Sequence, residues 1–153
     1  MSVPSRFVPF PTFRVLDRPE CDAILSRNAV GRLAYTLRGR VDLEPIHYAH
    51  DEDWLYGRTS EGSKLDVLAH HPWVAFEVDE IRGTFDWASV VVHGTFYRMH
   101  PEGSYDERQT YARSLAALRR ILPGTLSADD PVPTRRVVFG VHVDDVTGRA
   151  ASP

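Results

Sequence analysis

The chain has 153 residues, of which 42% are hydrophobic and 25% are charged, and its net charge is −3. This composition is typical of one globular domain with its own core, and the negative net charge argues against a nucleic-acid-binding protein. One cysteine, Cys21, excludes an internal disulfide and a cysteine-based zinc site. With no secretory signal and no apolar run of membrane-spanning length, we expect a cytoplasmic protein.

The first 13 residues predict an extended arm, because three prolines alternate with the aromatic residues Phe7, Phe10 and Phe13. Aromatic side chains on an arm need a surface to cover them, on the same subunit or on a partner. Asp17 then has the position of a helix N-cap, with Glu20 three residues later, and predicts a helix to about Arg27.

A series of strands follows. Residues 30–37 and 41–49 predict a hairpin around Arg38-Gly39-Arg40, and Pro45 marks an edge, a bulge or a ligand-facing point in its second strand. Further strands are expected at 54–59, 73–79, 89–99 and 135–143, with 81–88 as a loop.

Two more helices are expected, a short one at 64–70 and a long one at 102–122. Consecutive strands often lack a helix between them, so a parallel α/β fold is excluded. The pattern predicts a mainly β protein, an antiparallel barrel of six strands with peripheral helices. We divide the chain into an arm at 1–13, one domain at 14–149 and a tail at 150–153.

The segment from Tyr56 to Lys64 carries the clearest chemical signal. It contains Arg58, Thr59, Ser60 and Lys64, which is the only lysine of the chain, and it leads directly into the short helix. Guanidinium, hydroxyl and ammonium groups beside a helix N-terminus are suited to a phosphate group, and Gly57 and Gly62 would let backbone N–H groups approach it. The spacing fits neither a P-loop nor a dinucleotide fingerprint. An exposed polar turn between a strand and a helix is the alternative interpretation.

Other chemical patterns are weaker. The seven histidines show no metal-binding spacing, so we expect no metal site, and no serine or histidine lies in a recognisable triad pattern. His47 follows Pro45 and is either a ligand-facing or a half-buried barrel residue. Trp87 and Ser89 precede the apolar run that starts at Val90, where the tryptophan either covers a planar ligand or closes the end of the barrel.

Taken together, five motifs resemble the pyridoxamine 5′-phosphate oxidase-like flavin-binding split barrels, and most closely their nitroimidazole-resistance-like branch. The motifs are Val30–Ala34, Pro45–Tyr48, Leu55–Leu65, Val74–Asp79 and Trp87–Val90 with Gly94. The resemblance implies a six-stranded split barrel that binds FMN at the interface of a homodimer.

The resemblance also implies roles for individual residues. It places Arg58, Thr59, Ser60 and Lys64 on the phosphate and ribityl chain and Pro45, Ile46 and His47 along the isoalloxazine ring. It places Trp87, Ser89 and Val90 against the ring or the ribityl chain, from the same or the other subunit.

The expected activity is the reduction of a small planar acceptor such as a nitroaromatic or a quinone. The chain departs from the true pyridoxamine phosphate oxidases, because the strand Leu43–Tyr48 lacks their basic residues. A flavin or haem carrier of the same fold without turnover, and a deazaflavin-dependent reductase, remain alternatives.

Overall fold

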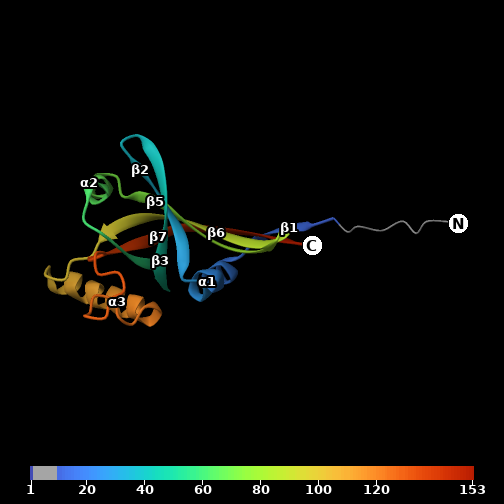
Figure 1. The fold of residues 1–153 in the computed structure, drawn as a ribbon. Coiled ribbons are helices and arrows are strands. Elements are labelled where there is room, and N and C mark those ends of the chain that lie inside the picture. Colours follow the sequence, from blue (N-terminus) through green and yellow to red (C-terminus); the bar gives the residue numbers. More distant parts are fainter. Residues whose placement is uncertain (2–9) are drawn as a thin grey trace.

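The computed structural model describes residue 1 and residues 10–153 of the chain. In that part it contains seven strands: β1 (Thr12–Leu16), β2 (Val30–Leu37), β3 (Arg40–Asp51), β4 (Trp54–Thr59), β5 (Trp73–Gly83), β6 (Asp86–Arg98) and β7 (Val137–Ser152). The helices are α1 (Arg18–Arg27), α2 (Ser63–His70) and α3 (Tyr105–Ile121). Figure 1 shows α2 and α3 at one end of the molecule and β1 with the C-terminus at the other.

The strands form one antiparallel sheet that closes into a barrel. Their order is β1-β7-β4-β3-β2-β5-β6, and β6 also pairs with β7 to complete the ring. Buried apolar side chains from alternate positions of the strands fill the interior, among them Leu33, Tyr48, Phe76, Val90 and Phe139. The expectation of a mainly β barrel with peripheral helices is confirmed.

The helices cover the outside and the ends of this barrel. Asp17 caps α1 as expected, because its carboxylate accepts a hydrogen bond from the Glu20 N–H while Glu20 reaches back to the Asp17 N–H. Helix α3 packs on β3, β4 and β7 through a second cluster of buried residues that includes Ala117, Leu118 and Val138. The loop after α3 therefore lies beside the ends of β3 and β4.

Three expectations about the strands need correction. The sheet has a seventh strand, β1, which pairs with the end of β7 from Thr12–Ser152 to Leu16–Gly148, so β7 continues through the residues expected to be a tail. Residues 81–88 do not form a loop: β5 runs to Gly83 and β6 begins at Asp86.

The aromatic arm is described only from Phe10 onward, and Phe7 lies outside the described residues.

Within the described residues, no helix is both long enough and apolar enough to cross a membrane.

Candidate functional site

A polar cavity of about 450 Å³ opens where β3 and β4 separate, next to the start of α2. Strand β3 pairs with β4 only from Tyr48–Gly57 to Asp51–Trp54, while its earlier residues pair with β2 alone. Pro45 lies in the part of β3 that has left β4, and it borders the cavity. Proline lacks a backbone N–H, so it cannot donate a ladder hydrogen bond and suits the point where two strands part. The expectation that Pro45 marks an edge is confirmed.

The turn between β4 and α2 forms one wall of this cavity. Ser60, Glu61, Gly62, Ser63 and Lys64 all line it. No side chain caps the N-terminus of α2, whose N-cap is Gly62. The first N–H groups of a helix have no partner inside the helix, and together with the helix dipole they attract an anion. This geometry would suit an anion.

Lys64 supplies a cation at this turn. Its side chain is only 18% exposed, its ammonium group forms an ion pair with Glu44, and it lies 5.7 Å from the ring centre of Tyr35. Burial of the Tyr35 ring, and to a smaller extent the negative charge of the nearby Glu44, raise the pKa of the Tyr35 phenol to about 12. Lys64 is thus held in place, and an anion that enters the cavity would compete with Glu44 for it.

Arg58 has a definite partner that the sequence did not reveal. Its two terminal nitrogens donate to the carboxylate of Asp130 at 2.6 and 3.1 Å, and Nη1 also donates to the Arg135 carbonyl at 3.3 Å. Both side chains are buried, with exposed fractions of 8% for Arg58 and 2% for Asp130. The hydrogen bonds from Arg58 hold the pKa of Asp130 well below its usual range. Arg58 borders the cavity, but most of its bonding capacity fastens the loop after α3 to the end of β4.

Thr59 and Ser60 complete this corner. Thr59 is buried at the end of β4, and the Ser60 hydroxyl donates to the Thr134 carbonyl at 3.1 Å. Six of the predicted site residues line the polar cavity: Pro45, Ile46, Arg58, Thr59, Ser60 and Lys64. Four further lining residues, Glu44, Glu61, Ser63 and Arg135, were not singled out from the sequence. Arg135 follows a proline-rich loop, a context that gives no local sign of a binding site.

His47 borders a second cavity. This one has a volume of about 300 Å³ and lies between β3 and the end of α3, and Arg58 and Arg135 line both cavities. Pro45 and His47 are exposed on one face of β3, while Ile46 between them is buried. The alternation follows from the period of two along a strand.

Trp87, Ser89 and Val90 lie far from both cavities within one chain. Trp87 pairs with Ala151 on β7, whereas Arg58 pairs with Val138 on the same strand. These two positions of β7 are thirteen residues apart, which is about 40 Å along an extended strand. Val90 is fully buried in the core, and the Ser89 hydroxyl donates to Glu77 at 2.9 Å.

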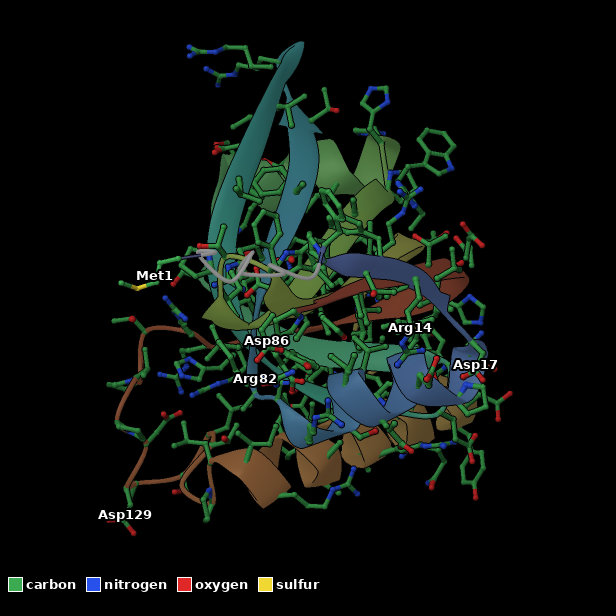
Figure 2. All side chains as sticks on the ribbon, turned by 90° about the vertical axis from the view of Figure 1, so that its right-hand side faces the viewer. Met1, Arg14, Asp17, Arg82, Asp86 and Asp129 are labelled. Carbon is green, nitrogen blue, oxygen red and sulfur yellow. The ribbon has the colours of Figure 1, made fainter. Side chains whose placement is uncertain are left out.

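The surroundings of Trp87 confirm this separation. Trp87 lies 6.4 Å from Phe13 of β1, measured between ring centres, and Phe13 contacts Phe85 at the same distance. Figure 2 shows the nearby Arg82 and Asp86 well apart from Asp129, which lies in the loop after α3. Trp87 and Ser89 can reach the cavities only from a second protomer.

Comparisons with known proteins agree with this architecture. The family model for pyridoxamine 5′-phosphate oxidase matches residues 17–150. An uncharacterized protein of Rhizobium meliloti is 30% identical over 146 residues, which are 90% of this chain and 95% of that protein. The chain therefore belongs to the pyridoxamine 5′-phosphate oxidase family.

Solved structures show the same fold. A FAD-binding protein of Mesorhizobium loti is 26% identical, with a TM-score of 0.72 over 92% of this chain and 99% of that one. A candidate 5-nitroimidazole antibiotic resistance protein of Bacteroides thetaiotaomicron is 18% identical, with a TM-score of 0.67 over 94% of this chain and 90% of that one. The resemblance to flavin-binding split barrels is confirmed as family and fold.

Proposed function

We propose that the protein is an FMN-dependent oxidoreductase that reduces a small planar electron acceptor, such as a nitroaromatic or a quinone. The observation that carries this proposal is the polar cavity at the uncapped N-terminus of α2, with Lys64 inside it. The family and the Mesorhizobium loti FAD-binding protein support a flavin as the anion-bearing ligand.

The residues present fit a flavin mononucleotide. Ser63, Lys64 and the first N–H groups of α2 would hold its phosphate, and Ser60 would join them once its hydroxyl released the Thr134 carbonyl. The side chain of Arg58 would hold the loop after α3 against the end of β4. Pro45 and His47 would lie along the ring, because both are exposed on the face of β3 that borders the cavities. A bound flavin supplies the electron transfer, and the protein supplies position and charge.

Oxidation of pyridoxamine phosphate is not the activity that we propose. The strand beside the cavity, from Leu43 to Tyr48, contains Glu44 and no arginine or lysine. It offers no second cation for the phosphate of such a substrate.

A homodimer would complete the site. Val41 and Leu43 are 82% and 62% exposed on β3, and with Pro45 they form an apolar stripe that leads to the polar cavity. At the other end of the molecule, Phe13 is exposed and packs against the half-buried Trp87. In a two-fold dimer each apolar surface could cover the other, which would bring Trp87 of a second protomer to the flavin.

Light scattering tests the dimer. The wild-type protein should have twice the mass of one chain at micromolar concentration, and Leu43→Asp should shift it toward the monomer because a charge would lie in the apolar interface. Asp42→Asn on the neighbouring position should leave the mass unchanged. A wild-type protein that stays monomeric contradicts the proposed dimer.

A titration of Lys64→Ala with FMN tests the phosphate site. The variant should bind FMN more weakly by about 1.5–3 kcal/mol, because it loses a charged hydrogen bond to the phosphate. Its affinity for riboflavin, which lacks the phosphate, should stay close to that of the wild type. Quenching of flavin fluorescence measures both, and FAD is titrated alongside for comparison.

The matched control is Glu44→Gln, which removes the partner of Lys64 and keeps the ammonium group. This variant should bind FMN at least as tightly as the wild type. If Lys64→Ala binds FMN and riboflavin as the wild type does, Lys64 does not hold the phosphate.

A further inference from the structure

The second cavity differs in character from the polar one. Its walls are the last turns of α3, the loop after α3 and the middle of β3, and half of its lining residues have apolar side chains: Leu118, Ile121, Leu122, Pro131 and Val132. Its volume of about 300 Å³ lies at the lower end of the range of small-molecule sites, about 300–1,000 Å³. An apolar enclosure of this size suits one small ring compound rather than a nucleotide.

The charge at this cavity is positive. No carboxylate is among its lining residues, and the charge of Arg58 is balanced by Asp130. The Arg135 side chain makes no hydrogen bond or ion pair with the described part of the chain. The exposed His47 adds a ring nitrogen that can donate or accept a hydrogen bond. One uncompensated cation beside an apolar enclosure selects a ring with a single negative group.

The position of the cavity indicates a role. It adjoins the proposed flavin cavity, because Arg58 and Arg135 line both, and His47 lies two residues from Pro45 on the same face of β3. A molecule in this cavity would lie beside whatever ligand occupies the polar one.

We propose that the cavity between α3 and β3 binds the electron acceptor, and that this acceptor is a small planar ring compound with one anionic group held by Arg135. The proposal rests on the proposed flavin function for the acceptor role, whereas the cavity itself is a feature of the single chain. Leu118 and Leu122 would contact the ring, and the specificity for an anion would come from Arg135.

Calorimetric titration of the FMN-loaded protein tests this, with 4-nitrobenzoate as the anionic probe and 4-nitrobenzyl alcohol as the neutral one. The carboxylate should bind about tenfold or more tightly than the alcohol, since it gains a charged hydrogen bond. Arg135→Gln should remove this preference. Ile121→Trp, at the partly exposed mouth of the cavity, should abolish binding of both probes and leave FMN uptake unchanged.

Arg120→Trp is the matched control, because Arg120 is exposed on α3 and is not among the lining residues. It should bind both probes as the wild type does. Equal affinities for the two probes, or unchanged binding in Ile121→Trp, would overturn the proposal.

Two further outcomes separate this inference from the flavin assignment. If the wild type takes up FMN but neither probe, the acceptor site is wrong and the flavin function stands. If Ile121→Trp lowers the affinity for FAD and leaves the probes unaffected, the cavity holds part of a longer cofactor, and the acceptor assignment is overturned.

Discussion

Asp130→Ala should lower the free energy of unfolding clearly more than the loss of an exposed ion pair does, measured by urea denaturation. The substitution leaves the buried guanidinium of Arg58 without its carboxylate partner. It also removes the acceptor of the Leu126 and Val132 N–H groups, which both bond to Asp130. Breaking a buried pair is costly because the remaining charge stays in a poorly solvated place.

An exposed ion pair provides the control. Arg82 and Asp86 lie 3.2 Å apart at the turn between β5 and β6, with exposed fractions of 61% and 40%, and Figure 2 shows both residues there. Arg82→Ala should cost less than about 1 kcal/mol, because exposed pairs contribute little. If Asp130→Ala costs no more than Arg82→Ala, Arg58 and Asp130 do not form the buried link described here.

The same pair predicts a pH dependence. The pKa of Asp130 is lowered in the folded protein, so its ionised form contributes stability above the unfolded value of about 3.9, and this contribution is lost as the pH falls further. The stability difference between wild type and Asp130→Asn should therefore be large at pH 7 and shrink steadily below about pH 4. A difference that does not change between pH 7 and pH 3 would contradict the shifted pKa.

Phe139→Ala should also destabilise the protein by about 3–5 kcal/mol, since it removes a buried ring from the core. The ring lies across from Gly57 on β4, where a Cβ atom would come within 2.6 Å of it, and it stacks on Phe96 at 4.8 Å between ring centres. Gly57→Ala in the wild type should cost about 1–3 kcal/mol through overpacking.

A double-mutant cycle makes this prediction sharper. Gly57→Ala should cost far less in the Phe139→Ala background, with an interaction energy of at least about 1 kcal/mol, because all the closest atoms to the added Cβ belong to the removed ring. Gly94→Ala with Val141→Ala is the contrasting pair, because the Cβ of residue 94 would also meet the His142 carbonyl oxygen at 2.2 Å. Val141→Ala does not remove this backbone oxygen, so it should reduce the cost of Gly94→Ala much less. Additive costs at Gly57 and Phe139 would contradict the described packing.

Much of the fold could be predicted because its signals are local. The capping box at Asp17 and Glu20 depends on residues three apart, and the hairpin of β2 and β3 depends on its own turn, where Arg38 and Gly39 both have positive φ. Strand β1 could not be predicted in the same way, because Thr12 pairs with Ser152 at the other end of the chain. The strand ends around Thr84 and Phe85 were missed because glycine and charged residues there resemble a longer loop.

In the candidate site too, the local features could be predicted from the sequence and the contacts between distant residues could not. The turn from Ser60 to Lys64 was found because its residue types and its neighbouring helix are contiguous in sequence. Asp130 was missed because its contact with Arg58 joins residues 72 positions apart. Gly57 was interpreted as a flexible approach to phosphate, but it lies inside β4, buried beneath Phe139, and its lack of a side chain makes room for that ring. Residue types indicate chemistry, whereas such partners appear only in three dimensions.

A crystal structure with bound FMN tests the central claim most directly. We predict that the phosphate lies within about 3 Å of the Lys64 ammonium and of the first N–H groups of α2, with the ring beside Pro45 and Trp87 of a second protomer. A crystal grown in excess FMN with this turn empty, and Lys64 still bonded only to Glu44, would contradict the account.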